Sequence, residues 1–213
     1  MRVVTAMLLA SAWALHWCGQ AGGAEPMELL AALQQGRIQA EFYGNGDQSV
    51  RGRIRPAPFG PEQVIVAPGT QFWAQQPGLQ GMTTVGWVPI DLRNRPFVFV
   101  EIPTACTNYD RPAPSRWHRM IPYPCPSPAM AALSETAAKL QPDRAVVQLA
   151  VWAVANDPEW EQVVGYAQAH AAGESEQERA TGALSLRQQA AGLLRSAWID
   201  PAAFRMFAPA PEQ

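Results

Sequence analysis

Cys106 and Gln148 have sequence surroundings that favour either a covalent reaction or close contact in the folded chain. Cys106 follows an apolar stretch, F-V-F-V-E-I at residues 97–102, and precedes a segment rich in proline. Gln148 lies in V-V-Q-L-A-V-W, a run that is too apolar for a surface helix. A buried primary amide costs roughly 1–3 kcal/mol when its donors and acceptors lack partners. We therefore expect Gln148 either to hydrogen-bond the backbone of the preceding half of the chain or to have reacted.

Two blocks around these residues resemble motifs of bacterial thioester domains. The first block is A-C-T-N-Y-D-R-P-A-P-S at residues 105–115, and the second is V-Q-L-A-V-W at residues 147–152. The resemblance covers about residues 97–157 at motif level. It implies a spontaneous internal thioester between the Cys106 sulfur and the Gln148 side-chain carbonyl, with loss of ammonia. Proteins of this family use the bond on extracellular adhesins to capture surface amines covalently.

The residue types suit this reaction. A thiolate is a good nucleophile, and it must be held against the amide carbon in the correct orientation. Trp152 would contribute to an apolar wall that keeps water from the ester. Asn108 and Asp110, close to Cys106 in sequence, could orient the thiol; the alternative role of these polar residues is a hydrogen-bonded turn.

Cys125 is a competing partner for Cys106. It lies in P-Y-P-C-P-S-P at residues 122–128, and a pair of cysteines in an exported chain commonly forms a disulfide. A Cys106–Cys125 bond would close a loop of about 20 residues and contribute on the order of 3 kcal/mol. Three states remain open: a disulfide, a thioester and two free thiols.

Other sites have less support. Cys106, His118 and an acid could form a cysteine-hydrolase set, but the local signatures of such enzymes are missing. Cys106, His118 and Cys125 lack the spacing of zinc ligands. The sequence has no glycine-rich phosphate loop and no dinucleotide fingerprint. We expect no catalytic residue, no metal and no cofactor.

The N-terminal segment 1–24 is predicted to be a secretory signal peptide. Arg2 precedes an apolar run at residues 3–15, and small residues at 22–24 offer a cleavage site. The run is shorter than the roughly 20 residues that span a bilayer, although an uncleaved anchor is the alternative. Cys18 is expected to leave with the segment. The mature protein would then be periplasmic or extracellular, without a membrane span.

The charge of the chain excludes some partners. Removal of Arg2 takes Lys+Arg from 16 to 15 against 18 Asp+Glu, so the formal net charge changes from -2 to -3. This mild acidity gives no electrostatic footprint for nucleic acid or an anionic membrane. The expected partner is an unknown protein or a surface amine.

The spacing of apolar residues is typical of strands in the first half of the chain and of helices in the second, which predicts an α+β fold. Residues 25–108 are expected to form a β-sandwich with a short N-terminal helix, and its antiparallel strands occupy about residues 37–105. Alternating apolar residues around the turn G-N-G-D at 44–47 predict a hairpin.

The second half is predicted to be helical. Residues 109–128 should form a Pro-rich crossing loop without regular structure. Residues 129–207 should form helices packed on the sandwich, with Ser127 and Asp143 as caps and a charged, solvated loop at about 173–182. Residues 208–213 are expected to be a disordered tail.

Two main hypotheses of function follow. The first is an exported, non-enzymatic binding or adhesion-type module in which Cys106 and Gln148 can form an internal thioester. The second is a periplasmic structural or interaction protein in which Gln148 and a Cys106–Cys125 disulfide serve stability alone. An unrecognised hydrolase that uses Cys106 and His118 is a third.

Overall fold

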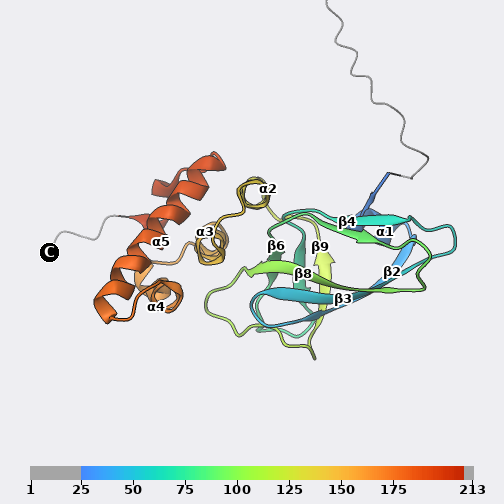
Figure 1. The fold of residues 1–213 in the computed structure, drawn as a ribbon, viewed down its shortest axis with the longest axis horizontal. Helices are drawn as coiled ribbons and strands as arrows, with labels where there is room; N and C mark the ends of the chain where they lie inside the picture. Colours follow the sequence, from blue (N-terminus) through green and yellow to red (C-terminus); the bar gives the residue numbers. More distant parts are fainter. Residues whose placement is uncertain (1–24, 209–213) are drawn as a thin grey trace, which may run out of the picture.

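The computed structural model describes residues 25–208 of the chain. The predicted signal peptide, residues 1–24, lies outside the described residues, as does most of the predicted tail. The described chain has a β-rich half followed by a helical half, and the two lie end to end (Figure 1). This order of strands first and helices second agrees with the hydrophobic pattern of the sequence.

The β-rich half is a closed antiparallel barrel with strand order β2-β3-β8-β6-β5-β9. Its strands are β2 (Ile38–Gly44), β3 (Ser49–Pro56), β5 (Gln71–Ala74), β6 (Met82–Thr84), β8 (Val98–Cys106) and β9 (Arg119–Tyr123). The predicted hairpin is confirmed, because β2 pairs with β3 along its whole length. A second sheet contains β1 (Met27–Glu28), β4 (Gln63–Val66) and β7 (Val88–Asp91), next to the short helix α1 (Leu29–Gln34).

The predicted β-sandwich is wrong, and β9 is the reason. This strand lies inside the Pro-rich segment 109–128 that we expected to be irregular. Met120 of β9 pairs with Phe42 of β2, and Ile121 pairs with Trp73 of β5. A strand that is paired along both edges closes the sheet on itself and removes its exposed edges.

Apolar side chains fill the barrel. Fully buried residues in its interior are Phe42, Val50, Ile54, Phe72, Met82, Ile102, Cys106 and Met120. The rings of Phe42 and Phe72 meet edge to face, with centroids 5.1 Å apart. Gly52 is required opposite Phe42, because a Cβ at residue 52 would lie 2.6 Å from the Phe42 ring.

Four helices form the second half: α2 (Pro128–Leu140), α3 (Arg144–Asn156), α4 (Trp160–His170) and α5 (Glu176–Ser196). Both predicted caps are present, since Ser127 Oγ accepts the Met130 N–H and the Asp143 carboxylate accepts the Ala145 N–H. Helix α5 begins earlier than predicted. A capping box between Ser175 and Glu178 starts it within the segment that we expected to be a loop.

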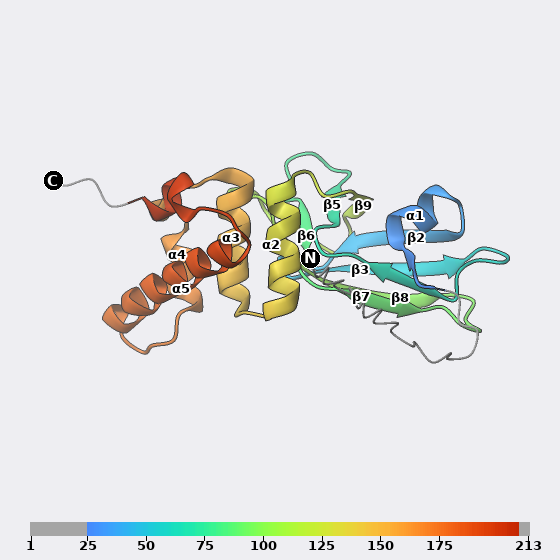
Figure 2. The same ribbon diagram turned by 90° about the horizontal axis from the view of Figure 1, so that it is seen from above.

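Helices α2 and α3 lie between the barrel and the outer pair, α4 and α5 (Figure 2). Helix α3 contacts β8 on one side and α2, α4 and α5 on the others. Every residue from Ala145 to Ala153 is buried, which explains why α3 is apolar around its whole circumference. Among the described helices, none has the length and apolar character that crossing a membrane requires.

Candidate functional site

Cys106 is the last residue of β8, and its side chain points into the barrel. Alternation along the strand puts Ile102 and Cys106 in the barrel core, whereas Ala105 belongs to the helical core. The Cys106 sulfur lies 3.8 Å from Met82 Sδ and 3.3 Å from the main-chain oxygen of Asp47. The thiol is 1 % exposed.

The backbone of Cys106 lies at a gap in the barrel wall. Cys106 is opposite Met82, and the Thr107 N–H donates to Gly81 O on the β6 side. The N–H and C=O of Cys106 therefore face the β3 side. Strand β3 does not reach this point, because its first residue, Ser49, pairs with Pro103. These two buried backbone groups need a partner from elsewhere in the chain.

Gln148 is that partner. The Cys106 N–H donates to Gln148 Oε1 at 2.9 Å, and Gln148 Nε2 donates to Cys106 O at 2.7 Å. The glutamine side chain is 4 % exposed. Its amide thus takes the place of a missing strand and joins α3 to the end of β8. The contact expected between Gln148 and the backbone of the preceding half is present.

Arg144 connects the same two parts of the molecule. Its Nη2 donates to Thr104 O at 3.0 Å and to Asp47 O at 3.4 Å. The Asp47 oxygen is also the polar neighbour of the Cys106 sulfur. The Asp47 oxygen therefore contacts both the Cys106 thiol and the Arg144 guanidinium.

Burial makes Cys106 a weak acid. It raises the pKa of the Cys106 thiol from 9.0 to about 12; the charge of Asp47 adds to this rise, and the charge of Arg144 opposes it. The pKa of Tyr166 is also raised, mainly by burial. At neutral pH Cys106 is a thiol and not a thiolate.

Trp152 lies one turn after Gln148 and is buried. Its ring meets Tyr166 of α4 edge to face, with centroids 4.7 Å apart. Tyr166 in turn stacks on His170, with centroids 4.0 Å apart. These aromatic rings fix α4 against α3 close to the Cys106–Gln148 pair.

The polar residues after Cys106 do not orient its thiol. Asn108 Oδ1 accepts hydrogen bonds from the Gly81 N–H at 3.1 Å and from the Thr107 hydroxyl at 3.2 Å. Asp110 is exposed. Asn108 therefore has the alternative role of stabilising a turn, and it holds the end of β8 to the start of β6.

The alternative of a Cys106–Cys125 disulfide is absent from the described structure, in which both cysteines are free. Cys106 lies inside the barrel, whereas Cys125 packs against the helical core. The Cys125 thiol donates to Ser127 O at 3.4 Å. The barrel wall lies between the two thiols, because strand alternation turns Cys106 inward.

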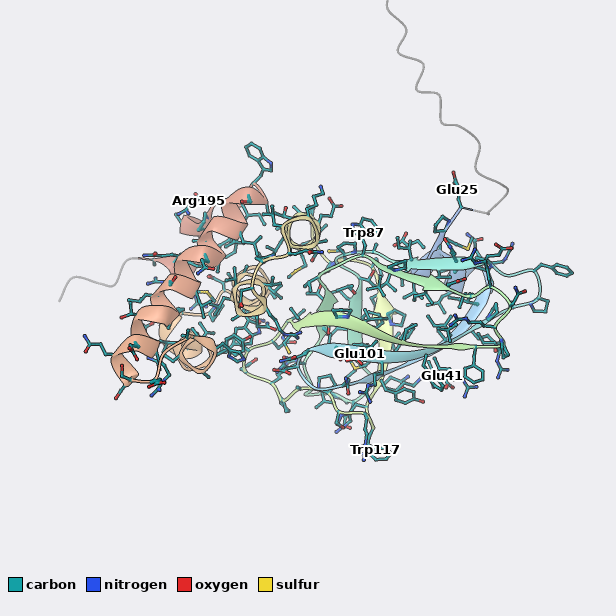
Figure 3. The ribbon with its side chains drawn as sticks, viewed as in Figure 1. Glu25, Glu41, Trp87, Glu101, Trp117 and Arg195 are labelled. Atoms are coloured by element: carbon teal, nitrogen blue, oxygen red, sulfur yellow. The ribbon has the colours of Figure 1, made fainter. Side chains whose placement is uncertain are left out.

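His118 has no part in the site. Its Nδ1 accepts the Ser115 N–H at 2.9 Å within the same loop. The neighbouring Trp117 is 77 % exposed and projects away from the barrel (Figure 3). The structure therefore does not bring together a cysteine-hydrolase set from Cys106 and His118. No group of three His, Cys, Asp or Glu residues suited to a metal ion occurs within residues 25–208.

A cavity of about 410 Å³ lies beside the Cys106–Gln148 pair. Ala105 and Val147, the residues just before Cys106 and Gln148, both line it, as does Arg144. Trp87, which is half-exposed, also lines the cavity. Sequence reasoning missed Arg144, Asp47 and this cavity, because no local pattern marks residues that meet only in the folded chain.

Comparisons with known proteins add no family: no protein-family model, curated protein or solved structure matches the chain.

Proposed function

We propose that this chain is an exported, non-enzymatic binding module in which Cys106 and Gln148 join to form an internal thioester. The observation that supports the proposal is the pair of hydrogen bonds between the Gln148 amide and Cys106, two residues 42 apart in sequence. Both residues are buried. Exclusion of water would protect a thioester from hydrolysis.

The hydrogen bonds also suit the chemistry of amide attack. The Cys106 N–H donates to Gln148 Oε1, the atom on which negative charge develops when a nucleophile adds to the amide carbon. The leaving nitrogen, Nε2, is held by Cys106 O. The sulfur contacts Asp47 O, an oxygen that also accepts from Arg144 of α3. A rotation of the Cys106 side chain would bring it toward the Gln148 carbon.

The step balances without any further reactant. The Cys106 sulfur adds to the side-chain carbon of Gln148, and the carbon–nitrogen bond breaks. The thiol proton leaves with the nitrogen as ammonia. A partner amine then opens the thioester: its nitrogen adds to the Gln148 carbon, the carbon–sulfur bond breaks, and a proton of the amine passes to the sulfur. The cavity lined by Ala105 and Val147 offers a route for that amine.

Exposure to methylamine is expected to label Gln148. Methylamine would open the thioester, so that Gln148 carries a methylamide and Cys106 becomes a free thiol. Peptide mass spectrometry locates both changes. Cys106→Ala should abolish the labelling, and Cys125→Ala, which changes the other described thiol, should leave it intact. Labelling of Gln148 that persists in Cys106→Ala would rule out a reactive thioester. A native protein that gains no methylamide at Gln148 would rule it out as well.

A second candidate function is an interaction protein whose Cys106–Gln148 junction is only structural. The contacts of the sulfur with Met82 Sδ and Asp47 O favour it, because neither is a contact with the amide. In this account Gln148 closes the barrel wall and fixes the helical half on it. Cys106 then remains a buried thiol, without chemistry.

The second candidate predicts a loss of stability at alkaline pH. The unfolded chain releases the Cys106 proton near pH 9.0, whereas the folded chain holds it to about pH 12. Between these values the unfolded state binds fewer protons, so the free energy of unfolding falls as pH rises. The loss is about 1 kcal/mol at one pH unit above the unfolded pKa. Urea unfolding of wild type and of Cys106→Ala at several pH values measures this loss. If the free energy of unfolding falls equally steeply with pH in the two proteins, that result would argue against a buried free thiol at Cys106.

A further inference from the structure

A second cavity lies at the other end of α3, beyond Gln148. It has a volume of about 300 Å³ and is lined by residues of β5, by those just after β8, by those around the start of α2 and by the last turn of α3. Polar side chains line it from all four segments: Gln71, Thr107, Asn108, Ser127 and Asn156, together with Trp73. We propose that this cavity binds one ring of a neutral saccharide.

Gln71 carries the inference. It is 1 % exposed, and within the described structure neither its Oε1 nor its Nε2 has a hydrogen-bond partner. Phe72 points into the barrel, so Gln71 faces the opposite way, toward the helices and the cavity. An unpaired buried amide destabilises a fold, and folded proteins rarely keep one without a use for it. A ligand in the cavity would supply the missing donor and acceptor.

The other polar groups define the chemistry of that ligand. Asn156 Oδ1 at the end of α3 is also buried without a partner in the described chain. Primary amides present donors and acceptors together, which matches hydroxyl groups that both donate and accept. No Asp, Glu, Lys, Arg or His is among the residues that line the cavity. A charged ligand would be desolvated there without an opposite charge, so the preferred ligand is neutral.

Trp73 adds the apolar contact that a sugar ring needs. Its side chain is 40 % exposed at the cavity. Gly81 makes room for it, since a Cβ at residue 81 would lie 2.6 Å from Thr107 Oγ1 and 3.3 Å from Trp73 Cε3. An aromatic ring offers an apolar face to the C–H groups of a pyranose, and its amide neighbours bind the hydroxyls. The volume is at the small end for ligand pockets, which suits a single ring.

The proposal does not depend on the thioester. The cavity is lined near the C-terminal end of α3 by Val154, Ala155 and Asn156, whereas Gln148 lies two turns earlier. Cys106 and Gln148 do not line it. A sugar could bind whether or not the Cys106–Gln148 bond forms.

Binding of free neutral sugars tests the proposal. Glucose, galactose, N-acetylglucosamine and their β-linked disaccharides are titrated against the full chain, with saturation-transfer NMR and calorimetry as readouts. At least one is expected to bind with a Kd of about 1 mM, the range of weak single-ring contacts. Glucuronic acid and N-acetylneuraminic acid should bind at least tenfold more weakly. Absence of binding by every neutral sugar, or tighter binding of the acids, overturns the proposal.

Substitutions then locate the site. Gln71→Met keeps the side-chain length but removes both polar atoms, so binding should weaken at least tenfold while Tm rises by about 3 °C. Trp73→Ala, at an exposed position, should weaken binding to a similar degree and fold normally. Trp117→Ala and Gln39→Met change an exposed tryptophan and a surface glutamine away from the cavity, and should leave binding unchanged. Unchanged binding in both Gln71→Met and Trp73→Ala would overturn the assignment.

Discussion

Replacement of Gln148 by leucine is expected to lower the free energy of unfolding by about 3 kcal/mol. The substitution removes both hydrogen bonds to Cys106 and leaves its backbone N–H and C=O buried without partners. Each unpaired buried group costs about 1–3 kcal/mol. Leucine cannot replace the missing strand, although it fills a similar volume. Once a thioester has formed, Nε2 has left as ammonia, so the substitution would then remove the covalent link and the hydrogen bond to Oε1 instead.

Thermal unfolding measures this effect. For a chain of this length, a loss of about 3 kcal/mol corresponds to a fall in Tm of roughly 6–12 °C. Gln188→Leu is a matched control, because it makes the same change at an exposed position of α5. The control should change Tm little. An equal Tm for Gln148→Leu and wild type would mean that the amide does not hold the two halves together.

Truncation of Leu149 to alanine is expected to cost about 2–5 kcal/mol. Leu149 follows Gln148 on α3, is fully buried and belongs to the helical core. Removal of its side chain loses apolar burial and leaves a cavity that neighbouring helices can only partly fill. The loss would loosen the face of α3 that holds Gln148 in position against β8.

Urea unfolding of Leu149→Ala tests this second prediction. Leu140→Ala is the control, since Leu140 ends α2 and is 58 % exposed. The control should remain within about 0.5 kcal/mol of wild type. If the two leucine variants lose equal stability, α3 is not the packed centre of the helical half.

Local signals in the sequence predicted the helical half well. Ser127 and Asp143 precede helices as side-chain caps, a feature that depends on a few neighbouring residues only. The burial of Gln148 followed from the apolar residues around it, because a helix without a polar face must be covered on all sides. Turn residues likewise predicted the β2–β3 hairpin.

Long-range pairing could not be predicted in the same way. Segment 119–123 contains Pro122 and lies among further prolines, so local rules argue against a strand there. It is a strand because β2 and β5 are placed to pair with its two edges. That arrangement closes the barrel around the Cys106 side chain, which alternation along β8 turns inward, whereas Cys125 packs against the helical core. The expected sandwich was wrong for this reason, and the disulfide, one of the three open states of the cysteines, is absent from the described structure.

The polar contacts of the site also arise only from the folded chain. Gln148 meets Cys106 because β3 begins too late to cover the end of β8. Gln71 looks like an ordinary polar residue of an alternating strand, yet the helices cover it without pairing its amide. Both glutamines are buried; the amide of Gln148 hydrogen-bonds Cys106, whereas the amide of Gln71 has no hydrogen-bond partner in the described structure.

The intact mass of the purified protein tests the central claim most directly. If Cys106 and Gln148 form a thioester, the native protein is lighter than its sequence mass by one ammonia. Cys106→Ala and Gln148→Ala should each have the full mass calculated for their sequences. A native protein that has the full mass, with both Cys106 and Cys125 reduced, would contradict the thioester and leave the junction as a purely structural contact.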